Sequence, residues 1–204
     1  MNRIDIKFKQ LRKAGKKAFI AFITAGDPSL KDTERLVVAF EKAGADIVEL
    51  GVPFSDPLAD GPTIQAASFR ALQRGVTVKK ILATVQRIRR VSEVPIALMT
   101  YYNPVFHFGE ERFVKAAMAA GVDGVIIPDL PVEESGALRR HAKAAGLSTI
   151  FLLAPTTTKE RMPGILNAST GFVYFVSVAG VTGARKTVPR EIAKNIRLAK
   201  TMTD

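Results

Sequence analysis

The chain has 204 residues, of which 47% are hydrophobic and 24% charged, a composition typical of a single globular domain rather than a disordered, collagenous or coiled-coil protein. It contains no Cys and only two His, which excludes disulfides and thiolate metal sites and leaves little material for a His-based metal cluster or a Ser-His-Asp triad. The basic N-terminal segment lacks the apolar core of a signal peptide, and no apolar stretch is long enough to span a membrane. We therefore expect a soluble, cytoplasmic protein.

The net charge of +11 could indicate a nucleic-acid binder. The basic residues are, however, scattered over several expected helices, and no aromatic residues lie between them for base stacking. This distribution favours solvated helix faces and predicts no nucleic-acid partner. The three main basic clusters are Arg87, Arg89 and Arg90; Arg139, Arg140 and Lys143; and Arg190, Lys194, Arg197 and Lys200.

Short apolar strands alternate with amphipathic helices along the whole chain. The first apolar run, 18–26, is hydrophobic on both faces, as in a strand of a parallel sheet that is covered on both sides. The helix expected next has apolar residues at helical spacing and ends at Gly44. In chain order, the pattern predicts strand 18–26, helix 29–43, strand 46–52, helices 61–74 and 79–90, strand 95–102, helix 110–120, strand 124–130, helix 133–145, strand 148–155, helix 159–168, strand 171–178 and helix 189–202.

This alternation predicts parallel βαβ units within one domain, because no linker or shift in composition divides the chain. The phrases KAGADIVEL and AAGVDGVII repeat the same arrangement, with Gly at a helix C-terminus directly before a strand. Six strands fit either an open doubly wound sheet or a (β/α)8 barrel that is about two βα units short. The first strand is followed by Gly26-Asp27-Pro28 and not by a dinucleotide-binding fingerprint. Spacing alone leaves both folds open.

Glu49 is the first candidate functional residue, because it lies in an otherwise apolar strand. A carboxylate in that position is either desolvated, with a raised pKa, or paired with a cation. The alternative is a side chain that reaches solvent at the end of the strand. Buried acids are rare without a reason, so we favour a functional role.

Asp60 lies in the stiff loop GVPFSDPLADGP that follows this strand. Because it precedes Gly61 and Pro62, it could cap the next helix or serve in catalysis, and its position alone does not decide between the two. Asp56 precedes Pro57, which is typical of turn chemistry.

Two further loops follow strands at the same end of a parallel fold. Residues 179–186 combine Gly, Thr and basic side chains, a composition that suits either an anion site or a mobile surface loop. Tyr101, Tyr102 and Tyr174 could wall a pocket for a flat substrate, or could simply pack in the core. His107 and His141 have no partners at metal-ligand or triad spacing, so we assign them no role.

Several segments resemble the tryptophan synthase alpha chain family. The similar segments are ELGVPFSDPLADGPTIQ (49–65), PDLPVEES (128–135), GVTGAR (180–185), FITAGDP (22–28) and YYNPVF (101–106), in register from about residue 5 to the end. The resemblance implies a TIM barrel. The family's chain normally continues for about two more βα units, so we expect residues 1–204 to be a single (β/α) barrel domain that is incomplete at its C-terminus.

The resemblance also implies an activity, the retro-aldol cleavage of indole-3-glycerol phosphate to indole and glyceraldehyde 3-phosphate. On this basis Glu49 is the general acid and base, and Asp60 stabilises the charge that develops on the indole nitrogen. The family's substrate-binding positions correspond to Phe22, Ile64, Tyr101, Tyr174, Thr182 and Gly183, with Thr182 in a closing loop and Gly183 donating to the phosphate.

The family works with the tryptophan synthase beta chain, usually as an α2β2 tetramer. The alpha chain itself needs no metal or cofactor, and pyridoxal phosphate belongs to the beta partner. The segments that face this partner contain Asp56, Pro57, Asn103, Phe106, Asp129, Pro131 and Glu134. Two alternatives remain: a stand-alone lyase that releases free indole, and an inactive binding form or fragment that lacks part of the phosphate site. Retention of both carboxylates and of the partner-facing segments favours the enzyme complex.

Overall fold

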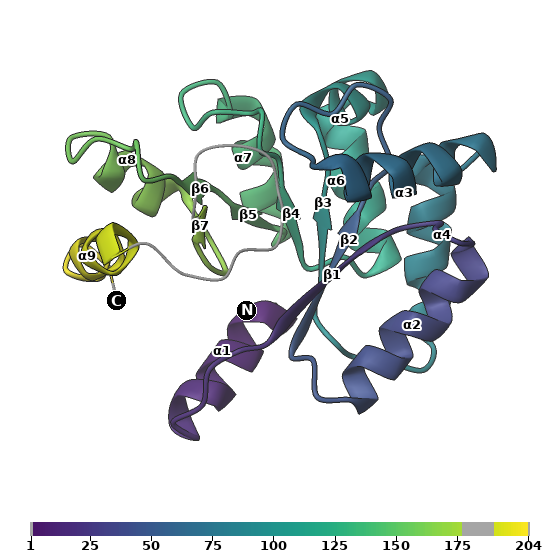
Figure 1. Ribbon diagram of the computed structural model, residues 1–204, viewed down its shortest axis with the longest axis horizontal. Helices are drawn as coiled ribbons and strands as arrows, with labels where there is room; N and C mark the ends of the chain where they lie inside the picture. The colour runs from purple at the N-terminus through teal and green to yellow at the C-terminus, as the bar shows by residue number, and fades with distance from the viewer. Residues whose placement is uncertain (1, 177–189, 204) are drawn as a thin grey trace.

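The computed structural model describes residues 2–176 and 190–203, in which helices lie outside a curved layer of parallel strands (Figure 1). The elements in chain order are α1 (Arg3–Lys13), β1 (Ile20–Thr24), α2 (Leu30–Lys42), β2 (Ile47–Gly51), α3 (Pro62–Gln73), α4 (Val78–Ile88), β3 (Ile96–Met99), α5 (Tyr102–Phe108), α6 (Glu110–Ala120), β4 (Gly124–Ile126), α7 (Gly136–Ala145), β5 (Ser148–Ile150), β6 (Leu152–Leu153), α8 (Met162–Ala168), β7 (Tyr174–Phe175) and α9 (Arg190–Lys200).

The strands follow one another in sequence order. The main sheet has the order β1-β2-β3-β4-β5, every pair is parallel, and β6 pairs with β7 in a second small sheet. A doubly wound sheet reverses its strand order at a switch point, whereas a barrel keeps sequence order. The topology therefore decides between the two folds in favour of the barrel.

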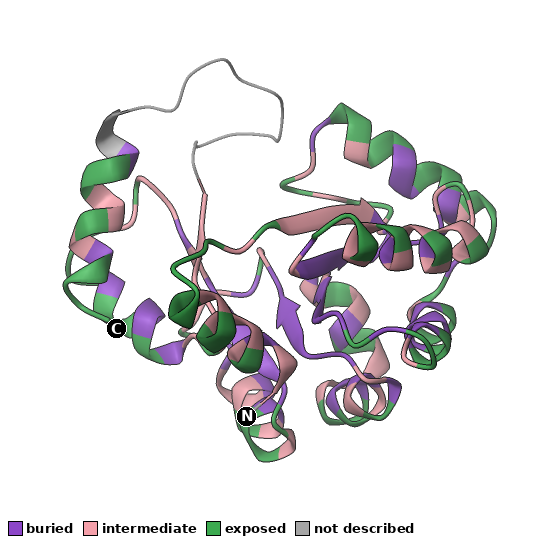
Figure 2. Ribbon diagram, turned by 90° about the horizontal axis from the view of Figure 1, so that it is seen from below, coloured by how far each residue is buried: buried purple, intermediate pink, exposed green. Residues whose placement is uncertain are grey.

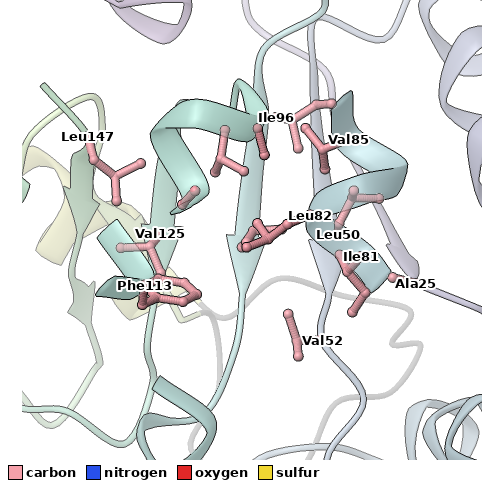
Figure 3. Packing of buried hydrophobic residues seen from close by; sticks show 14 of the residues in the cluster. Ala25, Leu50, Val52, Ile81, Leu82, Val85, Ile96, Phe113, Val125 and Leu147 are labelled. Atoms are coloured by element: carbon pink, nitrogen blue, oxygen red, sulfur yellow. The ribbon is translucent and has the colours of Figure 1, made fainter. Parts of the chain in front are cut away.

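Side chains alternate between the two faces of the sheet and form two different apolar layers. Val48 and Leu50 of β2 point outward and belong to the cluster under the surrounding helices. Figure 3 shows Leu50 in this cluster with Leu82 and Phe113. Ile47 points inward and packs with residues of β3, β4, β5 and helix α1. Figure 2 shows that the helices bury the sides facing the strands and expose the opposite sides. The inward layer consists of Ile4, Ile47, Ala97, Ile126 and Ile150.

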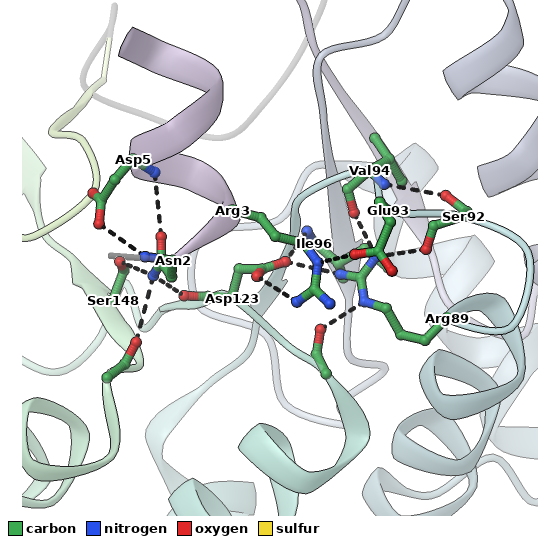
Figure 4. Close-up of polar contacts among 12 residues, drawn as sticks. Asn2, Arg3, Asp5, Arg89, Ser92, Glu93, Val94, Ile96, Asp123 and Ser148 are labelled. Atoms are coloured by element: carbon green, nitrogen blue, oxygen red, sulfur yellow. Dashed lines mark hydrogen bonds and ion pairs between the residues drawn. The ribbon is translucent and has the colours of Figure 1, made fainter. Parts of the chain in front are cut away.

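Helix α1, which the sequence analysis did not predict, closes the end of the barrel where the strands begin. Asn2 and Asp5 form a capping box, in which each side chain accepts from the other residue's backbone amide. The Asn2 side-chain amide also donates to Asp123 O at 2.9 Å and to Ser148 Oγ at 2.6 Å (Figure 4). These contacts place Ile4 inside the barrel, where it is fully buried.

A buried ion cluster lies at the same end. Asp123 is 2% exposed and accepts from the Arg89 guanidinium at 2.8 Å, from the Arg3 guanidinium at 3.1 Å and from the amide of Ile96 at 2.9 Å (Figure 4). The prediction that Arg89 lies on a solvated helix face is wrong: its side chain is only 10% exposed. Arg89 caps the C-terminus of α4, and there its side chain turns inward, away from the exposed face that carries Arg87.

The predicted strand 148–155 divides into β5 and β6. The amide of Thr149 donates to the side-chain hydroxyl of Thr170 at 2.8 Å, and Thr149 O accepts from the amide of Thr170 at 2.9 Å. Regular pairing with β7 begins after this point, where Phe151 O accepts from Tyr174 N at 3.0 Å. Helix α5 was also missed, because its seven residues, which overlap the segment YYNPVF and end at Phe108, are too few to show an amphipathic period. No helix in the described ranges is long and apolar enough to cross a membrane.

Candidate active site

Glu49 lies on the inner face of β2, one layer above Ile47. Its neighbours in the sheet register are Phe22 of β1 and Ala97 of β3. The side chain is not at a solvated strand end, as the alternative interpretation required, because Glu49 is only 4% exposed. Burial raises the pKa of its carboxyl to about 7. Within the described part of the chain, no hydrogen bond or ion pair reaches this carboxylate.

Tyr174 of β7 packs against the inner apolar cluster of Ile47 and lies close enough to Glu49 to feel its charge. Burial raises the pKa of the Tyr174 phenol, and the nearby charge of Glu49 raises it further. The structure thus brings these two predicted site residues together from strands 125 positions apart. Neutral Tyr174 is the form that this site stabilises, so it can serve as a wall and as a hydrogen-bond donor.

Phe22 covers the end of β2. A Cβ atom added to Gly51 would lie 2.6 Å from Cζ of the Phe22 ring, which is closer than real side-chain contacts allow. The Gly in the segment ELGVP therefore has a steric reason that sequence analysis missed: it lets the Phe22 ring approach the backbone beside Glu49.

Asp60 lies between β2 and α3, but it does not cap the helix. The N-cap residue is Gly61, which makes no side-chain capping bond, and Pro62 occupies the first turn. The capping interpretation is therefore wrong. Partial burial raises the pKa of the Asp60 carboxyl, and a hydrogen bond with the hydroxyl of Tyr101 acts in the opposite direction. The same hydroxyl accepts from the amide of Ala59 at 2.9 Å, which fixes it against the loop.

Four predicted site residues, Phe22, Asp60, Ile64 and Tyr101, line one small cavity of about 20 Å³. The cavity opens at the carboxyl ends of β1, β2 and β3, which is the usual location of active sites in barrels of this kind. The predicted phosphate-loop residues Thr182 and Gly183 lie outside the described residues. The remaining cavity-lining residues, which sequence analysis did not identify, are Thr24, Gly51, Val52, Ser68, Met99, Thr100 and Pro128.

The residues predicted to face a partner lie on the loops and the short helix α5 that follow β2, β3 and β4. Because these strands are neighbours, the three segments lie at the same end of the barrel. Phe106 is 66% exposed, an unusual exposure for a large apolar side chain, and Leu58 is exposed as well. The other residues predicted to face the partner are exposed or half-buried: Asp56, Pro57, Asn103, Asp129, Pro131 and Glu134.

This surface is joined directly to the cavity. The ring of Phe54, in the loop after β2, packs against Tyr101 with 5.4 Å between ring centroids. Asp129 Oδ1 accepts from the amide of Tyr102 at 2.9 Å, which links the loops after β4 and β3. In the ranges described, no group of three His, Asp or Glu residues is placed to hold a metal ion.

Comparison with known proteins identifies the family. The family model described as tryptophan synthase alpha chain matches residues 8–204. The chain belongs to this family. A tryptophan synthase alpha chain from Geotalea daltonii is 55% identical over 197 residues, which cover 97% of this chain and 75% of that relative.

Solved structures of alpha chains give the same result. The tryptophan synthase alpha chain of Legionella pneumophila superimposes with a TM-score of 0.90 at 38% identity, covering 100% of this chain and 74% of that chain. A structure of the tryptophan synthase α2β2 complex from Pyrococcus furiosus gives a TM-score of 0.84 at 43% identity, covering 91% of this chain and 74% of that chain. The barrel implied by the resemblance is thus confirmed, and the chain spans about three quarters of the length of these relatives.

Proposed function

We propose that this chain is the alpha subunit of tryptophan synthase and cleaves indole-3-glycerol phosphate to indole and D-glyceraldehyde 3-phosphate. One observation carries the proposal: an acid whose pKa lies near 7, Glu49, is buried on the inner face of the barrel beside a cavity that holds a second carboxylate, Asp60. Two carboxyl groups in different environments can take different protonation states at neutral pH, as a reaction with both an acid and a base step requires.

Glu49 has the properties needed for both proton transfers. In its neutral form it can protonate C3 of the indole ring, which moves positive charge to the ring nitrogen. The resulting carboxylate can then take the proton of the adjacent glycerol hydroxyl. The carbon–carbon bond breaks as the hydroxyl becomes an aldehyde, and its electrons restore the aromatic ring. A pKa of about 7 leaves both forms of Glu49 populated at neutral pH.

Asp60 supports the intermediate. Its carboxylate would accept the indole N–H and offset the positive charge that develops on the nitrogen. The hydrogen bond from Tyr101 favours the ionised form of Asp60, which this role requires. Phe22 and Ile64 line the same cavity and present apolar side chains that suit a flat aromatic ring, for which the cavity of about 20 Å³ would have to widen.

The other substrate contacts follow from the family resemblance. Tyr174, opposite Glu49, would close the far side of the reacting centre. Thr182 would belong to a loop that closes over the bound substrate, and the Gly183 amide would donate to its phosphate. Closing such a loop excludes water and completes the site. The alpha chain uses no cofactor in this proposal, because both carboxyl groups and the substrate supply the whole of the chemistry.

The proposed partner is the tryptophan synthase beta chain, in an α2β2 assembly that passes indole to the beta subunit for synthesis of L-tryptophan. Phe106 on the short helix α5 and Leu58 in the loop after β2 are exposed at the mouth of the barrel, and they support a partner at this face rather than a stand-alone lyase. Pyridoxal phosphate is expected only in that partner.

The test is indole release from indole-3-glycerol phosphate by the purified protein, alone and with the beta chain. Glu49→Gln keeps the size and the burial of the side chain but cannot exchange a proton, so it should abolish cleavage. The same variant should bind the beta chain as wild type does, because Glu49 lies inside the barrel. Cleavage by Glu49→Gln at the wild-type rate would overturn the mechanism, and an inactive wild type would overturn the function.

A further inference from the structure

Thr24, the last residue of β1, has a buried hydroxyl group that forms no hydrogen bond with the described residues. The residue is 7% exposed, and no atom in residues 2–176 or 190–203 bonds its Oγ1. Among the described residues it is the only buried side-chain polar atom of this kind. Burying an unpaired hydroxyl is unfavourable, and native structures seldom keep one without a reason.

The local backbone does not need this hydroxyl. The amide of Ala25 donates to Gly51 O at 2.8 Å, and the amide of Gly26 donates to the side chain of Thr33 at 2.9 Å. Strand formation does not need it either, because valine has the same shape and an equal preference for strands. A valine side chain in place of Thr24 would fill the space without burying an unpaired polar atom, so the reason for threonine lies in what the hydroxyl faces.

The hydroxyl-bearing side chain faces the proposed active site. Alternation along β1 puts Thr24 on the same inner face as Phe22, and both line the cavity that contains Asp60 and Tyr101. The cavity holds only about 20 Å³, roughly the space of one water molecule. Thr24 and Asp60 thus line the same narrow space.

Asp60 has unused capacity for a further donor. An ionised carboxylate offers about four acceptor positions, and Tyr101 supplies one hydrogen bond. Thr100 is also on the cavity wall, but its hydroxyl already donates to Tyr101 O at 3.2 Å. Thr24 thus combines an unsatisfied donor with a position beside an acceptor that must carry negative charge during the reaction.

We propose that Thr24 is a positioning residue whose hydroxyl donates to the Asp60 carboxylate when the indole ring is bound. The two donors, one from β1 and one from the segment after β3, then hold Asp60 from opposite sides and aim it at the indole nitrogen. This inference rests on the proposed function and adds a residue to the same site. In the described part of the chain this hydroxyl has no partner, so it remains available as a donor for the step in which charge develops.

Thr24→Val and Thr24→Ser separate the hydroxyl from the shape of the side chain. Thr24→Val should lower kcat for indole release about 10- to 100-fold, the effect of one hydrogen bond to a charged group, with little change in KM. Its melting temperature should equal or exceed that of wild type, because an unpaired polar atom is removed. Thr24→Ser keeps the donor and should recover kcat to within a few-fold of wild type.

Thr84→Val is the matched control. Thr84 is buried as well, but its hydroxyl donates to Lys80 O at 2.9 Å and accepts from Arg87 Nη2, on α4 and away from the cavity. This variant should lower the melting temperature and leave kcat unchanged. The same chemical change at Thr24 and at Thr84 should thus have opposite effects on stability and activity.

A second measurement does not depend on turnover. In saturating indole, the pKa of the Asp60 carboxyl, followed by carbon NMR, should be higher in Thr24→Val than in wild type, because the charged form loses a donor. An unchanged Asp60 pKa, or equal kcat for wild type and Thr24→Val, would overturn the inference. Equal losses of kcat in the Val and Ser variants would also overturn it. A wild type that releases no indole but shows the Asp60 shift would overturn the proposed function alone.

Discussion

The Glu49→Gln variant should be more stable than wild type, and the gain should depend on pH. Glu49 is almost fully buried, and the pKa of its carboxyl rises from 4.5 to about 7 because burial disfavours the charged form. The folded state therefore binds a proton more tightly than the unfolded state does. Below about pH 4.5 both states are protonated and folding carries no penalty from this group. As the pH rises towards 7, the unfolded chain ionises first, and stability is lost.

The magnitude follows from the size of the shift. A change from 4.5 to about 7 corresponds to about 3 kcal/mol at 1.36 kcal/mol per pH unit, fully present above pH 7. Gln does not ionise, so the variant avoids this cost. For a chain of this length, about 3 kcal/mol corresponds to a rise in melting temperature of roughly 6–12 °C. Near pH 4.5 the two proteins should melt almost together.

The assay is urea denaturation and thermal melting of both proteins at a series of pH values between about 4.5 and about 8.5, which bracket the shift. Glu133→Gln is a control of opposite sign. The exposed Glu133 carboxylate pairs with Arg161 at 2.8 Å, which lowers its pKa from 4.5 to about 2. Its loss should therefore reduce stability by nearly the same amount throughout this series, and the reduction should disappear only as the pH falls from about 4.5 towards 2. A stability difference between Glu49→Gln and wild type that is the same at every pH would refute the reasoning, because it would come from packing and not from ionisation.

Two other changes test the polar contacts at the two ends of the barrel. Asp123→Ala should reduce the free energy of unfolding by about 3–5 kcal/mol in urea denaturation, because Arg89 is then left buried without its carboxylate; a loss below about 1 kcal/mol would contradict this account. Tyr101→Phe removes a hydrogen bond that lowers the pKa of Asp60, so the acidic limb of the pH–rate profile should move to higher pH. An unmoved limb would show that the hydroxyl of Tyr101 does not act on Asp60.

The order of strands and helices could be predicted because each depends on local patterns. The helices that precede β4 and β5 end at Gly121 and Gly146, both in the left-handed conformation that the sequence pattern predicts. The inward or outward direction of each strand residue follows from simple alternation. Glu49 could be identified as a candidate because it is an acidic residue in an otherwise apolar strand, and this signal lies entirely in the neighbouring sequence.

Features that depend on distant residues could not be predicted. The contacts that hold α1 join Asn2 to Asp123 and Ser148, more than a hundred residues away. Helical periodicity predicted that Arg89 lies on the surface. Periodicity cannot show that Asp123, 34 residues further along the chain, forms an ion pair with it. The capping box of α1 is a local signal that could have revealed the helix, although not its place inside the barrel.

The two ends of the barrel differ in how their buried polar groups are paired. At the end where the strands begin, polar groups are paired: Asp123 has three donors, and Ile4 fills the interior beneath the strands. At the opposite end, Glu49 is buried without a hydrogen bond from the described residues, and the Thr24 hydroxyl has no partner among them. Proteins accept such unfavourable groups mainly where a ligand or a reaction uses them. The favourable contacts at the first end offset the unfavourable burial at the other. The same alternation of strand residues that turns Ile47 inward also turns Glu49 inward on β2, and it turns Thr24 inward beyond Phe22 on β1.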